Sequence, residues 1–211
     1  MKVLLVNGSP HEKGCTYTAL KETAQALEKK GIETEIFWIG KAAIGGCWGC
    51  AACRKLGKCV QNDVVNEFAD KCDGADGFVF GSPVHYASAG GAITSFMDRL
   101  FYSAGKKLSY KPAAALVSCR RGGATATFDQ LNKYFTINNM PVVSSNYWNQ
   151  IHGSAPEDAL RDEEGLQTAR MVGANMAWLL RCIELGKESG IAPEPEQKVY
   201  TNFIRREDFS R

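Results

Sequence analysis

Four cysteines that lie close together are the residues of this chain best suited to chemistry. Cys47, Cys50, Cys53 and Cys59 give the spacing C-x2-C-x2-C-x5-C. Three closely spaced thiolates with a fourth nearby can surround one compact iron–sulfur cluster. Structural zinc sites usually pair two separated ligand couples, so this continuous run suits zinc less well. Four reduced thiols in a glycine-rich loop explain the pattern equally, and the spacing leaves both interpretations open.

A second candidate site follows the first apolar run of the chain. Residues 2–6 (KVLLV) lead into residues 7–10 (NGSP), and a helical segment begins near Thr16. A buried strand that feeds a helix through such a loop aims unpaired N–H groups at one point, where phosphate binds. Because neither G-x-G-x-x-G nor G-x-x-x-x-G-K-[ST] is present, amides and the hydroxyls of Ser9, Thr16 and Thr18 would have to bind it. This favours a small mononucleotide, and an ordinary strand-to-helix turn is the alternative.

Both candidate sites need elements to position them, and short β-rich runs alternate with helical stretches along the chain. We expect strands at residues 2–6, 32–39, 77–81, 113–118 and 141–145. This alternation predicts a doubly wound α/β fold: a five-stranded parallel sheet with helices on both faces and ligands at the C-terminal ends of the strands.

The loops after the third and fourth of these strands should meet the phosphate loop at one edge of the sheet. Residues 81–91 are mostly small, which allows close approach to a flat ligand, and Tyr86 offers a ring for stacking. Residues 118–123 place Arg120 and Arg121 beside two glycines, where they can stabilise an anionic ring or a phosphate. Each loop alone is compatible with turn chemistry, but together they favour a ligand with a phosphate and a planar ring.

Length and composition narrow the class of protein. The chain has 211 residues, and 25 Lys and Arg against 23 Asp and Glu give a net charge of +2, without the basic excess typical of nucleic-acid or membrane binding. No apolar run suits a signal peptide or a spanning helix, so we expect a cytoplasmic protein with reduced thiols. We expect one domain at 1–190, with a cysteine-rich insertion at 45–60, and a C-terminal arm at 191–211 that packs on its own domain or on a second subunit.

At these loops the chain resembles the flavodoxin-like NAD(P)H-dependent FMN reductases. The matching motifs are GSP at 8–10 with Thr16, GSP at 81–83 with Phe96, Asp98 and Arg99, RRGG at 120–123 with DQL at 129–131, WN at 148–149 and HG at 152–153. The resemblance implies a single-domain flavodoxin-like fold with strand order 2-1-3-4-5. It also implies that FMN contacts Ser9, His11, Thr16, Thr18, Ser82, Pro83, Val84, His85, Tyr86, Cys119, Arg120 and Gly122. Cys15 and Cys119 depart from the family pattern, in which asparagine and glycine are usual.

The cysteine spacing resembles that of the iron-sulfur flavoproteins, which share the FMN-binding pattern. That resemblance implies a [4Fe–4S] cluster held by Cys47, Cys50, Cys53 and Cys59. Many relatives in the reductase family keep such cysteines without a metal, so free thiols stay the alternative.

The predicted function is an FMN-dependent NAD(P)H oxidoreductase. Electrons from NADH or NADPH pass through FMN to a small acceptor, such as a quinone, a nitro or azo compound or free flavin, and the cofactor rather than a side chain performs the chemistry. We expect Trp148 and His152 at the substrate face.

Two other functions are weighed against this one. The first is an iron-sulfur flavoprotein electron carrier that accepts electrons from ferredoxin, although a nearly neutral chain is unlike a strongly charged docking partner. The second is a thiol-based redox sensor, which leaves the three loops without a role.

Residues 96–102 are apolar beyond one core face, and the family resembled builds dimers or tetramers, so we expect a homodimer or homotetramer.

Overall fold

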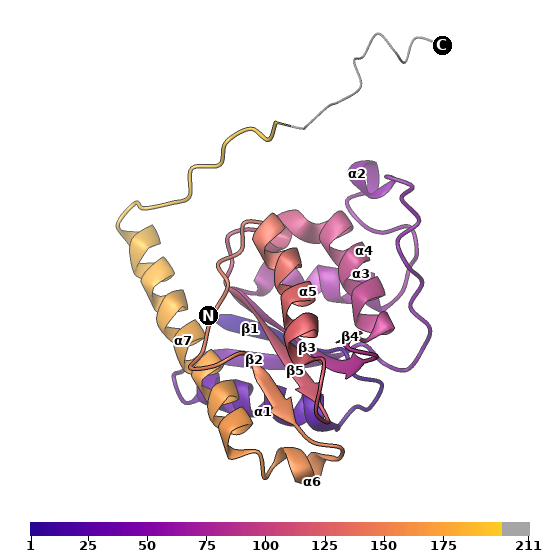
Figure 1. Cartoon of the computed structure of the whole chain (residues 1–211). Helices are drawn as coiled ribbons and strands as arrows, with labels where there is room; N and C mark the ends of the chain where they lie inside the picture. The colour runs from indigo at the N-terminus through magenta and orange to yellow at the C-terminus, as the bar shows by residue number, and fades with distance from the viewer. Residues whose placement is uncertain (200–211) are drawn as a thin grey trace.

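The first apolar run of the chain forms a strand that is buried on both faces. In β1 (Lys2–Asn7), Val3 and Leu5 pack against one layer of helices, and Leu4 and Val6 pack against the other. Side chains alternate along a strand, so a run that is apolar at every position belongs in the middle of a three-layer sandwich. The computed structural model describes residues 1–199, and Figure 1 shows this arrangement.

The sheet has the order expected from the alternating elements. Its parallel strands lie in the order β2-β1-β3-β5-β6, with bounds β2 (Glu33–Trp38), β3 (Gly77–His85), β5 (Ala113–Cys119) and β6 (Gln150–His152). This confirms the predicted flavodoxin-like order, because β4 (Ser88–Ala89) pairs antiparallel with the end of β3 outside that path. The order changes direction between β1 and β3, where ligands of such sheets bind.

Helices cover both faces of the sheet. One face carries α1 (Cys15–Glu28) and α7 (Glu163–Glu188), which pack against each other, and the other carries α3 (Val64–Lys71), α4 (Gly91–Leu108) and α5 (Ala124–Ile137). Short helices lie in the connections: α2 (Cys53–Leu56), η1 (Cys72–Gly74) and α6 (Pro156–Ala159). The segment that contains α2 projects beyond the layer of α3 and α4 (Figure 1).

The fifth strand lies later in the chain than the sequence indicated. Residues 141–145 form only an isolated bridge, between Val142 and Ala113, and the strand beside β5 is Gln150–His152. The prediction of a strand at 141–145 was therefore wrong. The cause is a local turn: the hydroxyl of Ser145 donates to the carbonyl of Tyr147 and bonds the side chain of Asn149, which bends the chain away from the sheet after the bridge.

Most of the apolar side chains of residues 96–102 are buried in the core of their own chain. Phe96, Met97 and Leu100 are fully buried between the sheet and the neighbouring helices, and Phe101 packs against the same core, whereas Tyr102 is 73% exposed. This run therefore gives little support to the expected homodimer or homotetramer, which stays a prediction.

The C-terminal segment leaves the domain after α7. Residues 191–199 have no regular structure, are exposed and extend away from the helices (Figure 1). The packing of the predicted arm at 191–211 stays a prediction. Tyr200, Phe203 and Ile204, which gave the arm its apolar character, lie outside the described residues. Within residues 1–199, no helix is both long enough and apolar enough to cross a membrane.

Candidate functional site

The predicted phosphate loop is held in shape by its own side chains. The Oδ1 atom of Asn7 accepts a hydrogen bond from the amide of Ser9 (3.1 Å), and its Nδ2 donates to the carbonyl of Glu12 (2.9 Å). The Oγ of Ser9 accepts from the amide of His11 (3.1 Å), and the indole of Trp38 donates to the carbonyl of Ser9 (2.8 Å). These bonds fix the path of the chain from β1 into α1.

The first turn of α1 presents free amides to this loop. Gly14 precedes the helix without a side-chain cap, and the N–H groups of Cys15, Thr16 and Tyr17 have no acceptor among residues 1–199. Such amides carry the positive end of the helix dipole and are suited to an anion. The hydroxyl of Thr16 is buried beside them and bonds the Oγ of Ser118 at the end of β5 (2.7 Å).

The loops that follow β1, β3 and β5 approach one another closely because glycine occupies two positions where a Cβ would not fit. The amide of Gly8 donates to the carbonyl of Gly81 (2.9 Å), and a Cβ on Gly8 would lie 2.7 Å from that oxygen. Gly123 has φ +89°, and a Cβ there would lie 2.6 Å from the Cα of Ala87. The loops after β1, β3 and β5 therefore meet at one edge of the sheet, as the sequence predicted.

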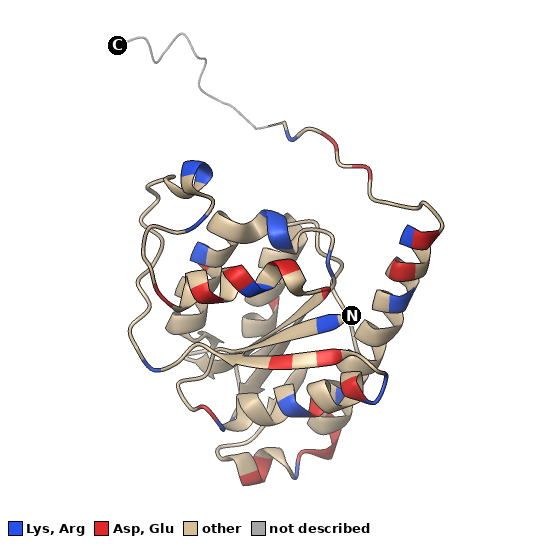
Figure 2. Cartoon of the chain, turned by 180° about the vertical axis from the view of Figure 1, so that it is seen from behind, with Lys and Arg blue, Asp and Glu red and all other residues tan. Residues whose placement is uncertain are grey.

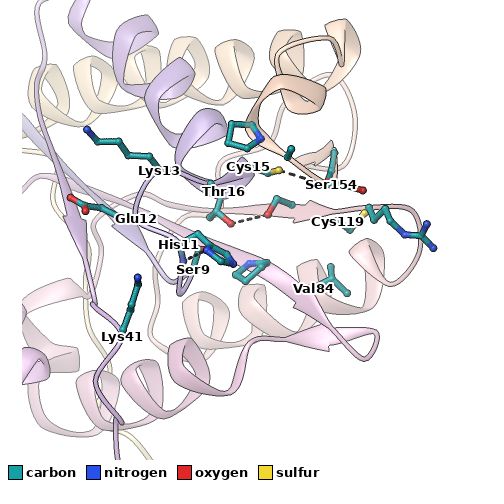
Figure 3. Close-up of a pocket in the computed structure, with 17 residues that line it drawn as sticks. Ser9, His11, Glu12, Lys13, Cys15, Thr16, Lys41, Val84, Cys119 and Ser154 are labelled. Atoms are coloured by element: carbon teal, nitrogen blue, oxygen red, sulfur yellow. Dashed lines mark hydrogen bonds between the residues drawn. The ribbon is translucent and has the colours of Figure 1, made fainter.

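These loops enclose a cavity of about 700 Å³, which we call the edge cavity (Figure 3). Its size is in the range of small-molecule sites. The lining comes from the first loop and α1, from Lys41 after β2, from the C-terminal ends of β3 and β5 with Arg120 after β5, and from residues 153–156 after β6. Figure 3 shows Ser9, His11 and Thr16 in the middle, with Cys15, Cys119 and Ser154 on one side and Lys13 and Lys41 on the other.

Cationic side chains contribute to the edge cavity. Lys13, Lys41 and Arg120 line it, against one carboxylate, that of Glu12. The sequence argument expected hydroxyls and amides, without lysine, to bind the phosphate, and that stays a prediction; it considered only residues that follow the glycine loop directly and did not anticipate the two lysines of this lining. Lys41 follows β2, the neighbour of β1, and its position after a strand end was the available signal.

Two thiols also line the edge cavity, and neither is ionised easily. Burial raises the pKa of Cys15 and that of Cys119 above the usual value of 9.0. The Sγ of Cys15 donates to the carbonyl of Gly153 (3.6 Å). Both groups are therefore neutral thiols at physiological pH.

A second cavity, of about 370 Å³, lies in the cysteine-rich insertion, and we call it the cysteine cavity. All four cysteines of the quartet line it, together with Trp48, Arg99 and Tyr102. Cys47 and Cys50 are exposed, whereas Cys53 and Cys59 are half-buried. The Sγ of Cys53 donates to the carbonyl of Tyr102 on α4 (3.6 Å).

The thiols of this cavity are compatible with an iron–sulfur cluster. Within residues 1–199, no three Cys, His, Asp or Glu side chains form a group that could hold one metal ion. A tetrahedral zinc requires its ligands around one point, whereas a [4Fe–4S] cube binds four cysteines at separate corners. The four cysteines that line this cavity are the ligand type and number that such a cube needs.

A buried arginine of α4 contributes to the lining of the cysteine cavity. The side chain of Arg99, on α4, has no exposed surface, and it forms a bidentate ion pair with Asp63 (2.6 and 2.8 Å). Burial by itself lowers the pKa of Arg99, but hydrogen bonds to Asp63 and Cys59 outweigh burial and leave that pKa above its usual value. The guanidinium is charged.

Comparison with known proteins assigns the chain to a family. Residues 1–154 match the NADPH-dependent FMN reductase family. The chain belongs to this family. It is therefore an NAD(P)H-dependent flavin oxidoreductase with FMN as its cofactor, and the edge cavity fits that cofactor in position, volume and phosphate-binding groups.

Individual relatives agree with this assignment. The chain is 34% identical over 192 residues to an iron-sulfur flavoprotein of Methanocaldococcus jannaschii, covering 87% of this chain and 100% of that protein. Two solved structures share the fold. RosB with bound 8-demethyl-8-formylriboflavin-5'-phosphate has a TM-score of 0.69 and 16% identity, covering 98% of this chain and 93% of that chain. An NAD(P)H:quinone oxidoreductase of Methanothermobacter marburgensis has a TM-score of 0.62 and 16% identity, covering 83% and 98%.

Most of the residues that the sequence predicts as FMN contacts in this reductase line the edge cavity: Ser9, His11, Thr16, Pro83, Val84, Cys119 and Arg120. The others lie outside its lining: Thr18, Ser82, His85, Tyr86 and Gly122. Sequence reasoning missed further lining residues: Glu12, Lys13, Gly14, Cys15, Lys41, Ser118 and residues 153–156.

Two predicted hydroxyl contacts are engaged locally in the reductase. Thr18 lies one turn into α1 and its Oγ1 donates to the carbonyl of Gly14 (3.3 Å). Ser82 is fully buried; its Oγ donates to the carbonyl of Pro83 (2.8 Å) and accepts from the amide of Gly90 (3.2 Å). Hydroxyls near a turn often bond the nearby backbone in this way. Both side chains shape the loops that border the cavity.

Of the two residues predicted at the substrate face, His152 lies beside the edge cavity. The amide of His152 donates to Asp162 (2.6 Å), and its Nδ1 lies 3.4 Å from the same carboxylate. His152 lines an open hollow with Arg120, which also lines the edge cavity. Trp148 is 51% exposed and packs against Tyr147 with ring centroids 4.7 Å apart. Their role at the substrate face stays a prediction.

Proposed function

We propose that this enzyme passes electrons from NADH or NADPH through FMN to a small acceptor, such as a quinone, a nitro or azo compound or free flavin. The observation that carries the proposal is the edge cavity, where unpaired helix amides, two lysines and three strand-end loops meet. When bound, FMN would supply the chemistry, which is hydride uptake from a reduced nicotinamide and electron transfer to the acceptor.

The residues of the first loop and α1 bind the phosphate in this proposal. The amides of Cys15, Thr16 and Tyr17 provide hydrogen-bond donors without acceptors of their own. The ammonium groups of Lys13 and Lys41 add positive charge at the same side of the edge cavity (Figure 3). The dianion of a phosphate monoester is the ligand that such a set of donors favours.

The other loops position the ring. Pro83 and Val84 at the end of β3, Cys119 at the end of β5 and Arg120 after it line the rest of the edge cavity. Arg120 brings a fixed positive charge to that region, which favours the anionic reduced ring over the neutral oxidised one. The hollow beside His152 is open enough to admit a nicotinamide or an acceptor.

Steady-state oxidation of NADH and NADPH by the FMN-loaded protein tests this function. Each acceptor class is assayed in turn, with free FMN at the same concentration as the control. We expect turnover well above the control with at least one acceptor. Turnover equal to that of free FMN with every acceptor would contradict the proposal.

A second candidate function is an electron carrier with a [4Fe–4S] cluster in the cysteine cavity and ferredoxin as donor. Two observations favour it: all four cysteines line one cavity, and a relative 34% identical is named an iron-sulfur flavoprotein. Arg54 and Lys55 on α2 give the exposed edge of this segment a positive charge (Figure 2), which suits an acidic partner.

Anaerobic purification distinguishes the two functions. A brown protein with acid-labile sulfide, whose FMN is reduced by ferredoxin faster than by NADPH, supports the carrier. A yellow protein without sulfide after reconstitution with iron and sulfide excludes the cluster. Changing all four cysteines to serine should leave NAD(P)H oxidation intact if the reductase function is the correct one.

We further infer a cytoplasmic location, because all eight cysteines, which lie within the described residues, are free thiols. The homodimer or homotetramer expected from the family is part of the proposal. Exposed Ile137 and Trp178, on helices of opposite faces, offer apolar surface for it. A light-scattering mass of one chain at micromolar concentration would contradict it.

A further inference from the structure

Cys59 is held by hydrogen bonds at its amide, its carbonyl and its sulfur, whereas Cys53 is held at its sulfur by one bond to Tyr102. The amide of Cys59 donates to Asn66 Oδ1 (3.1 Å), and its carbonyl accepts from Asn66 Nδ2 (2.9 Å). Its Sγ accepts a hydrogen bond from the Nε of Arg99 (3.3 Å). Cys47 and Cys50 are exposed, in a segment with positive φ at Gly49 and Gly57.

Arg99 ties the two ends of the cysteine-rich segment to α4. Besides Cys59, its guanidinium donates to the carbonyls of Gly45 (3.4 Å) and Gln61 (2.7 Å) and twice to Asp63. These bonds use all five N–H groups that an arginine carries. Asp63 is fixed in turn, because it caps α3 by accepting from the amide of Val65 (3.1 Å).

Burying a charged arginine costs desolvation free energy, and a segment with a purely structural role does not require such a residue. Buried charged groups persist where they are paired and where a function uses them. This guanidinium points a hydrogen bond at a cysteine sulfur, and the other bonds hold the guanidinium in place.

We propose that Arg99 is the positioning residue of the cysteine cavity: it fixes the Cys59 sulfur as the first ligand of a cluster and, through its Nε–H···Sγ hydrogen bond, favours the cluster's reduced state. This inference rests on the cluster of the second candidate function. One-electron reduction adds negative charge to a cluster and its thiolates without breaking a bond, and hydrogen bonds to the sulfurs raise the reduction potential.

The test compares two charge-changing variants whose effects have opposite signs. R99Q removes the positive charge and the donor to Cys59, so it should lower the cluster's reduction potential. D63N removes the negative charge that faces Arg99, so it should raise that potential. We expect R99Q to change the ratio of reduced to oxidised cluster at least tenfold at a fixed potential, about 59 mV for one electron.

K107Q is the matched control. Lys107 lies about two turns later on α4 and bonds Asp73 (2.7 Å) and the carbonyl of Ala69 (3.2 Å), so it also ties α4 to its neighbours, but away from the cysteines. Its loss should leave the potential unchanged. The measurement is an anaerobic redox titration of the reconstituted full-length proteins, monitored by electron paramagnetic resonance, with thermal unfolding as a check on folding.

Opposite shifts in R99Q and D63N support the proposal. Equal potentials, or shifts of the same sign in both variants, overturn it, because a purely structural loosening of the segment has no reason to depend on the sign of the lost charge. If R99Q fails to bind a cluster, D63N decides alone: a raised potential supports the proposal and an unchanged or lowered one refutes it. If the unaltered protein binds no cluster, the second candidate function and this inference are both rejected. If it binds a cluster but the variants have unchanged potentials, only the role of Arg99 is rejected.

Discussion

Replacing Thr16 with valine should separate cofactor binding from folding at the edge cavity. Valine keeps the shape of threonine but lacks the hydroxyl that bonds Ser118 Oγ at 2.7 Å. With FMN bound, the same hydroxyl can accept from Ser118 and donate to the phosphate. A hydrogen bond to a charged group contributes about 1.5–3 kcal/mol. At about 1.4 kcal/mol for each tenfold, T16V should weaken FMN binding about ten- to a hundredfold.

The same change has a separate cost in stability. It leaves the buried hydroxyl of Ser118 without its partner, which destabilises a protein by about 1–3 kcal/mol. Changing both residues, in T16V/S118A, removes donor and acceptor together. The double variant should regain most of the free energy of unfolding but none of the FMN affinity, because the two effects have different causes.

The matched control for T16V is T23V. Thr23 is buried about two turns further along α1, where its hydroxyl donates to the carbonyls of Ala169 (2.9 Å) and Ala19 (3.1 Å), away from the edge cavity. T23V should lose stability and keep its FMN affinity. Quenching of FMN fluorescence gives the dissociation constants and urea unfolding gives the stabilities. Equal FMN affinity in T16V and T23V would refute the role assigned to the Thr16 hydroxyl.

Three further predictions follow from the geometry. Hydrogen bonds, chiefly from Lys71, lower the pKa of Glu35 below 4.5 in the folded state. The stability that these bonds give is therefore present above pH 4.5 and is lost as the pH falls through the lower pKa of the folded state. E35Q should reduce this loss of stability at acid pH, as measured by urea unfolding from pH 6 to pH 3. G123A should destabilise the protein by about 1–3 kcal/mol and weaken FMN binding, since φ is +89° there, whereas G122A, whose new Cβ meets no protein atom within 4 Å, should leave the free energy of unfolding unchanged; equal losses of stability in the two variants would contradict this. K41Q should weaken FMN binding several-fold at low salt and much less at high salt, and an affinity loss independent of salt would show that Lys41 does not act through its charge.

The strand order could be predicted because the strands alternate with helices and most of them are short apolar runs buried between helices, although the edge strand β2 is only partly buried. Four of them stand out, and β1 is the clearest, with Val3 to Val6 entirely buried. The fifth strand of the sheet is not such an apolar run, so the sequence pattern did not identify it. Gln150–His152 has only Ile151 buried, whereas Val142 and Val143 give a stronger apolar run that makes one bridge. Which of two neighbouring segments joins a sheet depends on a turn of side-chain hydrogen bonds, which periodicity does not report.

The edge cavity was predicted in outline and not in detail. Loops after strands of known order must converge, so the contribution of Ser9, Thr16 and Arg120 followed from topology. Lys41 was missed because it is far from the glycine loop in sequence. Local bonding also decides which hydroxyls face a ligand, as Thr18 shows.

The cysteine cavity shows a similar limit. An arginine between buried residues of an apolar helix must have a partner, so the sequence contained a signal at Arg99. The partners, Asp63 and Cys59, come from a segment with little regular structure, and only the folded chain brings them together.

Amide hydrogen exchange of the first turn of α1, with and without FMN, tests the central claim most directly. The amides of Cys15, Thr16 and Tyr17 have no acceptor among the described residues, so FMN should slow their exchange strongly, while amides in the middle of α7 should change little. Unchanged exchange at Cys15 to Tyr17 under saturating FMN would show that the phosphate is bound elsewhere and would contradict the assignment of the edge cavity.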